Sequence, residues 1–408
     1  MRRRSPARRR KLFLGAAFTI AALNLRPTIA AVSPVLQDIR RTTGLTDVGL
    51  ALLTTLPLVC FGLLAPAAPG LVRRFGTGAV LLSCVGLLVA GTILRSVGLV
   101  GLFAGTVVLG VGIAVANVLI PGIVKEDFPE RAGLMTGMYT MALSAGPAAA
   151  AGLSAPLTHA LGGDWRLSTA LWALPGAAAF FVLLPLRSHR RPSSLVPAPR
   201  HTGLWRDPVA WAVTLFMGLQ SLEFYSALAW LPTIFSSHGL SADAAGGLLA
   251  ATNLVGIVAA LFTPAITERL PDTRIAIFGC VGFLAAGTAG LIFAPGSLQL
   301  LWAALLGLGQ GSAISLAILL MVLRSHDPQQ AMRLSGMSQG VGYLIAALGP
   351  AMTGALHQIF GGWTIPLSVL LGILGLMAAS GYIAGRNGKI GPAEVQMALE
   401  ESGSLEVR

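Results

Sequence analysis

The stretch Ala21-Ala-Leu-Asn24-Leu-Arg26-Pro27-Thr28-Ile-Ala-Ala31 lies in the middle of an apolar run from about Leu12 to Leu36. A run of that length can cross a bilayer as a helix. An arginine at its centre costs about 3 kcal/mol on insertion scales, and such residues normally face a bundle interior or a water-filled cavity. Pro27 has no N–H group, so the carbonyl of Leu23 loses its helical donor. A charge beside a loosened helix is typical of discontinuous membrane helices, so we expect Arg26 to face a ligand. The alternative is a structural arginine that ties two helices together.

The composition places the whole chain in a membrane. Only 11% of the 408 residues are charged and 54% are apolar, whereas about a quarter of the residues of a soluble protein are charged. Twelve apolar segments follow one another, and the fold class that we predict is an all-α membrane protein with twelve transmembrane helices. The segments are 12–36, 47–69, 77–94, 98–123, 132–157, 166–186, 208–235, 243–267, 275–294, 298–322, 332–357 and 364–385.

The net charge of +12 does not indicate nucleic acid as a partner, because the positive charges follow the membrane topology. Seven of the first eleven residues are Arg or Lys, which predicts a cytoplasmic N-terminus. Most of the 28 basic residues then fall in tails and loops on that same side; the exceptions are Arg26, Arg40, Arg41, Arg95 and Arg166. We therefore expect a multi-pass protein with both termini in the cytoplasm and a basic tail on anionic lipid.

Weak self-similarity indicates two six-helix halves. Gly44-Leu45 matches Gly239-Leu240 at an offset of 195, and Gly162-Gly163 matches Gly361-Gly362 at an offset of 199. Repeats of this kind are common in transporters. The domains that we predict are a cytoplasmic tail (1–11), an N-terminal half (12–186), a cytoplasmic linker (187–207), a C-terminal half (208–385) and a second tail (386–408).

Several short motifs accompany this layout. They are Asn24-Leu-Arg-Pro27, Leu53-Thr-Thr-Leu-Pro57, Asn117-Val-Leu-Ile-Pro121, Asp127-Phe-Pro-Glu-Arg131, Gly218-Leu-Gln-Ser221, Ala229-Trp-Leu-Pro232, Gly307-Leu-Gly-Gln-Gly311 and Ser335-Gly-Met-Ser-Gln-Gly-Val-Gly-Tyr343. Jointly they resemble the cyanate/2-nitroimidazole transporter (CynX/NimT) family of the major facilitator superfamily. The resemblance implies secondary active transport by alternating access in the bacterial inner membrane, by a monomer, of a small solute such as cyanate or a nitroimidazole-like aromatic.

The loop after the second span departs from the superfamily pattern Gly-x-x-x-Asp-Arg-x-Gly-Arg. Here it is Pro69-x-x-x-Arg73-Arg74-x-Gly76-Thr77, which has no acidic residue. Glu268, in the repeat counterpart Glu268-Arg269, is an acid that could replace it. We therefore predict a gate formed by Arg73, Arg74, Glu268 and Arg269.

Polar side chains at mid-span are the candidate substrate ligands. They are Arg26, Asn24, Asn117, Tyr139, Gln220, Glu223, Tyr225, Gln310, Gln339 and Tyr343. Pro121 frees the carbonyl of Asn117, and Asn24 is about 200° round the helix from Arg26. Each amide or tyrosine, taken alone, fits a helix-to-helix hydrogen bond or a packing role better than a ligand contact.

Glu223 lies near the centre of the seventh span, the counterpart of the first, and should share a depth with Arg26. Three roles remain open for it: neutralising Arg26 in the empty state, carrying a proton, or forming a purely structural ion pair. One buried arginine suits a monovalent anion, and a co-transported proton would remove the electrical cost of its uptake.

Other classes of function have little support. The six histidines lie at loops or span ends without metal-ligand spacing, and Cys60, Cys84 and Cys280 fall inside spans. No phosphate loop or nucleophile elbow is present, so we expect neither an enzyme, nor a cofactor, nor a metal. Efflux of neutral aromatic drugs is the competing transport function, and a membrane sensor or membrane-embedded enzyme is a more distant alternative.

Overall fold

The computed structural model describes residues 6–188, 203–294, 296, 298–386 and 388–390, and in this part of the chain all regular structure is helical. The α-helices of the first half are α1 (Pro6–Leu25), α2 (Pro27–Ala30), α3 (Leu36–Thr43), α4 (Asp47–Leu64), α5 (Ala68–Phe75), α6 (Thr77–Leu94), α7 (Gly98–Asp127), α8 (Ala132–Ala160), α9 (Trp165–Leu171) and α10 (Ala173–Leu183). Those of the second half are α11 (Pro208–Ser237), α12 (Ala242–Thr267), α13 (Thr273–Phe293), α14 (Gln299–Leu323), α15 (Pro328–Phe360) and α16 (Thr364–Ala384). Short 3₁₀ turns such as η2 (Ala65–Ala67) join some of them.

Helices occupy all twelve predicted segments. Within the described residues, nine segments are long and apolar enough to span a membrane. The other three spans are α8, α11 and α15, which are 29, 30 and 33 residues long and carry more polar side chains. Helix α1 begins at Pro6, inside the segment predicted as the N-terminal tail, and the candidate membrane span begins at Gly15. Most of the predicted linker and C-terminal tail lies outside the described residues.

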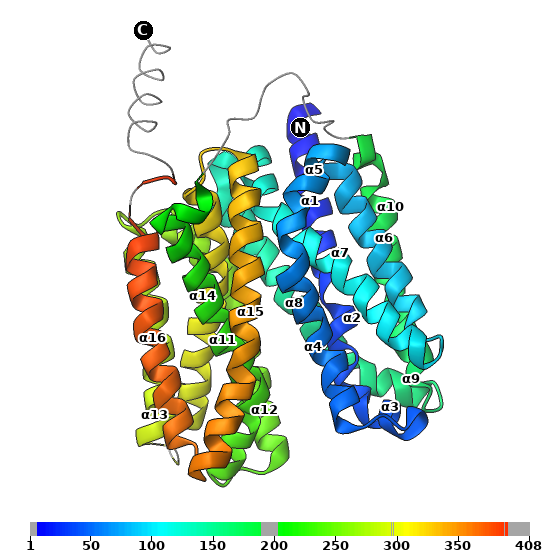
Figure 1. Ribbon diagram of the computed structural model, residues 1–408, viewed down its shortest axis with the longest axis vertical. Coiled ribbons are helices and arrows are strands. Elements are labelled where there is room, and N and C mark those ends of the chain that lie inside the picture. The colour runs from blue at the N-terminus through cyan, green and yellow to red at the C-terminus, as the bar shows by residue number, and fades with distance from the viewer. Residues whose placement is uncertain (1–5, 189–202, 295, 297, 387, 391–408) are drawn as a thin grey trace, which may run out of the picture.

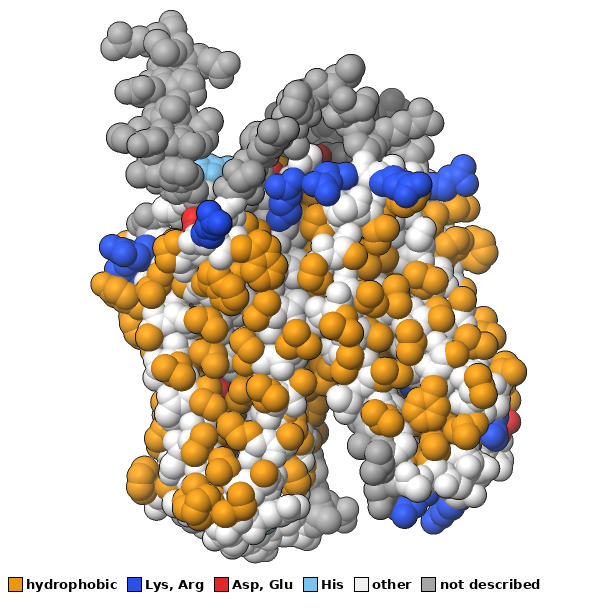
Figure 2. Space-filling model, viewed as in Figure 1, with side chains coloured by type: hydrophobic (Ala, Val, Ile, Leu, Met, Phe, Trp, Pro, Cys, Tyr) orange, Lys and Arg blue, Asp and Glu red, His pale blue; other side chains and the backbone are white. Residues whose placement is uncertain are grey.

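The two halves form separate bundles that lie side by side (Figure 1). Between the halves, α8 packs on α12, and α15 packs on α4 and α7. Most exposed basic side chains gather at one end of the molecule, near Arg73, Arg74 and Arg269 (Figure 2). We call this the basic end, and we call the opposite end, which carries Arg40 and Arg41, the far end.

Small residues let the halves close at the basic end. A Cβ atom on Gly133 would lie 2.6 Å from the Pro264 carbonyl oxygen, and one on Gly137 would collide with the Leu261 carbonyl. Towards the far end the two halves part. Figure 2 shows the corresponding notch between the halves. The structure is therefore closed at the basic end and open at the far end.

Candidate functional site

The first span is broken at the predicted arginine. Helix α1 ends at Leu25 and α2 begins at Pro27, so Arg26 occupies the junction. The Leu23 carbonyl, which Pro27 deprives of a donor, faces Gly146 of α8, where a Cβ atom would collide with it. The glycine lets α8 pack directly on the break, and this packing fixes the position from which Arg26 extends.

Arg26 reaches across to the other half. Its Nη2 donates a hydrogen bond of 2.7 Å to the hydroxyl oxygen of Tyr343 on α15. The Tyr343 ring packs on Phe61 of α4 with a centroid distance of 5.2 Å. Arg26 also lies within electrostatic range of the hydroxyls of Tyr139 and Tyr225. The structure thus brings four of the predicted residues together: Arg26, Tyr139, Tyr225 and Tyr343.

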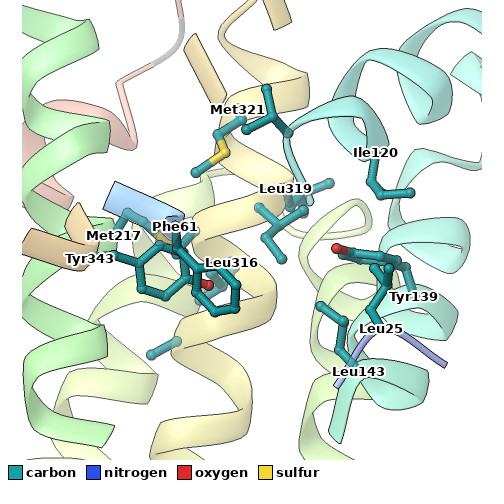
Figure 3. Packing of buried hydrophobic residues seen from close by; sticks show 14 of the residues in the cluster. Leu25, Phe61, Ile120, Tyr139, Leu143, Met217, Leu316, Leu319, Met321 and Tyr343 are labelled. Carbon is teal, nitrogen blue, oxygen red and sulfur yellow. The ribbon is translucent and has the colours of Figure 1, made fainter. Parts of the chain in front are cut away.

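A second bond between the halves uses the carbonyl that Pro121 frees. Gln339 Nε2 donates to the Asn117 carbonyl oxygen at 3.1 Å and to Ser335 Oγ at 2.7 Å. Within the N-terminal half, the Tyr139 hydroxyl donates to Asn117 Oδ1 at 2.9 Å. Figure 3 shows Tyr139 and Tyr343 on opposite sides of the boundary between the two halves, with the Tyr139 hydroxyl directed toward that boundary.

Two donors at this site have no acceptor. Arg26 Nε and Asn117 Nδ2 are buried and make no hydrogen bond to any described residue. No carboxylate among the described residues forms an ion pair with Arg26 either. An unsatisfied buried donor costs about 1–3 kcal/mol, and more when it is charged. The site therefore has positive charge and spare donor capacity.

The remaining candidates lie apart from this cluster or bond within their own helices. Asn24 donates to the Ile20 carbonyl at 2.8 Å, as expected from its place on the other side of the helix. Gln220 donates to Ser221 Oγ at 2.6 Å and to the Met217 carbonyl at 3.1 Å. Gln310 is buried on α14 with 9% of its surface exposed.

Glu223 forms no ion pair with Arg26 in this conformation. It is 5% exposed, and its Oε1 has no hydrogen-bond partner among the described residues. Ser226, three residues further along α11, likewise has a buried hydroxyl without a partner. Glu223 therefore does not belong to the cluster formed by Arg26 and the three tyrosines.

Sequence reasoning missed Arg95, which it placed with the loop residues. Arg95 is only 3% exposed, and its Nη1 donates to the Thr28 carbonyl oxygen at 2.6 Å. That carbonyl is free because the Val32 N–H bonds to Ile29 instead. Burial lowers the pKa of Arg95 to about 10, so the side chain stays charged at neutral pH. Arg95 directly follows the apolar run of α6 in the sequence. This position did not distinguish it, because loop arginines commonly occupy the same place.

Comparison with known proteins identifies the family. The family model described as Major Facilitator Superfamily matches residues 12–350. The 2-nitroimidazole transporter of Escherichia coli (strain K12) is 38% identical over 385 residues, covering 93% of this chain and 97% of that protein. The chain belongs to the major facilitator superfamily. The Cyanate transport protein CynX of the same organism is 32% identical over 367 residues, covering 88% of this chain and 94% of that protein.

A solved superfamily structure has the same fold. The proton:xylose symporter XylE, bound to 6-bromo-6-deoxy-D-glucose, superimposes with a TM-score of 0.74 at 12% identity, covering 93% of this chain and 96% of that chain. The predicted fold and the predicted resemblance to the CynX/NimT family are thus confirmed. This protein is a membrane-spanning superfamily transporter of small solutes, and the family members are transporters rather than enzymes.

The predicted superfamily gate is only partly assembled. Glu268 Oε1 accepts a hydrogen bond of 2.5 Å from the N–H of Gly133, in the first turn of α8, and so joins the halves at the basic end. Arg73, Arg74 and Arg269 are exposed, and the guanidinium of Arg74 lies 5.1 Å from the centre of the Phe75 ring. Glu268 of the C-terminal half thus contacts the N-terminal half at the N-terminus of α8.

Proposed function

We propose that this protein is a secondary active transporter that binds a small monovalent anion, such as cyanate, between its halves at Arg26. Two observations support this proposal. The buried donors Arg26 Nε and Asn117 Nδ2 lack an acceptor among the described residues, and the Arg26 guanidinium has no carboxylate partner there. An anion would satisfy both donors by charge-assisted hydrogen bonds. Tyr139, Tyr225 and Tyr343 would complete the site, with Gln339 positioning Asn117.

We further propose that a proton accompanies the anion and that Glu223 carries it. Moving one negative charge inward against 100 mV costs about 2.3 kcal/mol, and a co-transported proton removes this cost. Glu223 is buried and has no cationic partner among the described residues, and a lone charge in such a place is costly. A protonated carboxyl at that position avoids the cost.

The proposed orientation puts the basic end and both termini in the cytoplasm of a bacterium, with the protein monomeric in the inner membrane. The positive-inside rule supports it. Glu268, together with Arg73, Arg74 and Arg269, would then belong to the cytoplasmic gate. Cysteine labelling at Arg73 and Arg41, which lie at opposite ends, tests this orientation: label that reaches Arg73→Cys from outside intact cells would reverse it.

Uptake of radiolabelled cyanate into proteoliposomes tests the anion site. Replacing Arg26 by Ala removes a charged hydrogen-bond donor, which is worth about 1.5–3 kcal/mol, so uptake at subsaturating anion should fall about 10- to 100-fold. Arg41→Ala is the matched control, because that side chain is 80% exposed at the far end. Wild-type uptake by Arg26→Ala, with the folded protein in the membrane, would refute the assignment.

A second candidate is efflux of small neutral aromatics. The cluster of three tyrosines around Arg26 favours it, as does the similarity to a 2-nitroimidazole transporter. In that case Arg26 would be structural through its bond to Tyr343. Export of 2-nitroimidazole that is independent of salt and pH and survives Arg26→Lys would favour efflux over anion uptake.

A further inference from the structure

A cavity of about 510 Å³ lies at the far end of the C-terminal half, away from Arg26. It lies between the last turns of α11, α13 and α15 and the start of α16. Its walls include four hydroxyl residues, two histidines and one tryptophan, alongside aliphatic side chains. A volume of this size and a mixed lining are typical of small-molecule sites.

The internal repeat explains why the cavity exists in one half. The segment Ala90-Gly-Thr-Ile93 matches Ala289-Gly-Leu-Ile292 at an offset of 199, which aligns Arg95 with Ala294. The same offset aligns Trp165 with Thr364, and each of these two residues begins a helix.

In the N-terminal half, these positions hold large side chains that pack. Arg95 is 3% exposed and Trp165 is 2% exposed, and the Trp165 indole donates to Thr42 Oγ1 at 2.8 Å. Their counterparts in the C-terminal half are short, and Thr364 is exposed on the cavity wall. The wall of the cavity in the C-terminal half thus carries a threonine where the N-terminal half carries a buried indole.

The lining suits a flat ring with polar edges. The His357 ring stacks on Trp363 at a centroid distance of 3.9 Å and an interplanar angle of 9°, so the two present an ordered aromatic wall. The Nδ1 atoms of His238 and His357 are buried and have no hydrogen-bond partner among the described residues, so both imidazoles have unused hydrogen-bonding capacity. Thr233 and Thr364 add hydroxyls that donate or accept.

The charge state of the walls favours a neutral ligand. Burial lowers the pKa of His238 below its ordinary value, so this imidazole is uncharged at neutral pH. Among the described residues, the lining contains neither a carboxylate nor a lysine or arginine. An ion entering the cavity would lose hydration without meeting an opposite charge, whereas a neutral ring would bury apolar faces and keep its hydrogen bonds.

We propose that this cavity is a second binding site, which takes a neutral planar nitrogen heterocycle of the azole class. The ring continues the His357–Trp363 stack and bonds through its edge to imidazole and hydroxyl groups. The site lies between α11, which carries Glu223, and α15, which carries Tyr343. It is independent of the anion site and goes beyond the function proposed for Arg26.

Calorimetric titration of the purified full-length protein with 2-nitroimidazole at pH 6 and with imidazole at pH 8, where each ring is mainly uncharged, tests the proposal. Thr364→Trp introduces the side chain that fills the matching place in the N-terminal half, and it should weaken binding at least about tenfold. Ser368→Trp is the control, since Ser368 is exposed one turn further along α16 and does not line the cavity. Arg26→Ala should leave this binding unchanged, whatever it does to cyanate uptake.

His357→Leu provides a second variant in case Thr364→Trp does not fold, as judged by its melting temperature. It removes the ring from the stack and should weaken binding about five- to tenfold. The proposal is overturned if the wild type binds neither azole, or if binding survives both cavity variants. Binding that is lost only in Arg26→Ala would also overturn it, because the ring would then occupy the central site.

Discussion

Arg26 and Tyr343 join the two halves of the protein through a 2.7 Å hydrogen bond from the guanidinium Nη2 to the phenol oxygen. One turn earlier on α15, Gln339 makes another bond between the halves, to the Asn117 carbonyl. Both residues lie on one face of α15, since they are four positions apart. Movement of α15 relative to the N-terminal half must therefore break both bonds, which couples the occupancy of Arg26 to the arrangement of the halves.

Tyr343→Phe removes the only hydrogen-bond partner that Arg26 has among the described residues and keeps the ring that packs on Phe61. A buried charged donor is then left unsatisfied, so we expect a loss of about 1–3 kcal/mol in stability. Added cyanate should raise the melting temperature of this variant more than that of the wild type, because the anion can replace the lost acceptor. Thermal unfolding measured with and without cyanate checks this.

Tyr382→Phe is the matched control, because Tyr382 is 48% exposed on α16. Equal cyanate-induced shifts in Tyr343→Phe and the wild type would argue against an anion at Arg26.

The sequence predicts the break at Arg26 because its causes are local. Pro27 removes a donor wherever it occurs in a helix, and a charge in an apolar run must face inward. The freed carbonyl of Asn117 follows from Pro121 in the same way, although its partner Gln339 depends on how α7 meets α15.

Arg95 shows what sequence reasoning could not reach. An arginine directly after an apolar run enters water in most membrane proteins. Here it turns inward, because the Thr28 carbonyl is free to accept and Gly105 leaves room beside the Arg95 side chain. Both conditions belong to the tertiary fold. The contact of Phe61 with Tyr343 was likewise invisible, since a phenylalanine in an apolar span carries no signal of its own.

Arg95→Met should destabilise the N-terminal half by about 2–4 kcal/mol, because it leaves the Thr28 carbonyl without a donor and removes a charged hydrogen bond. Arg95→Lys should recover part of that loss, since an ammonium can still donate to a carbonyl. Thermal unfolding in detergent gives the comparison, and Arg166→Met, at an arginine that lies over the Trp165 ring at the same end, is the control. Unchanged melting in Arg95→Met would show that the bond contributes nothing to holding the broken helix.

Glu223→Gln keeps the size and hydrogen-bonding capacity of the side chain but cannot release a proton. If Glu223 carries the coupled proton, an inward proton gradient should no longer accelerate anion uptake by this variant. Exchange of anion across the membrane without a pH gradient should continue. Proteoliposomes with and without a pH gradient separate the two rates. Gln220→Glu is an informative companion, because it puts an acid three residues away on the same helix. A gradient-driven rate that stays at the wild-type value in Glu223→Gln would remove Glu223 from the coupling.

Gly137→Ala should shift the protein away from the conformation that is closed at the basic end. The new methyl group would collide with the Leu261 carbonyl of α12, a backbone atom that cannot move aside as a side chain can. Glu268→Gln should act in the same direction but more weakly, since it reduces a charge–dipole attraction at the start of α8 that is worth about 0.3–1 kcal/mol. Spin labels at Arg131→Cys and Arg269→Cys, both exposed at the basic end, report the separation of the halves.

The distance between these labels should lengthen in Gly137→Ala. Gly152→Ala is the control on the same helix, because its methyl group would meet nothing within 4 Å. The native cysteines Cys60, Cys84 and Cys280 are buried and should contribute little background labelling. An unchanged distance distribution in Gly137→Ala would mean that α8 and α12 accommodate the added methyl group without separating. Close backbone packing at Gly137 would then not be what keeps the basic end closed.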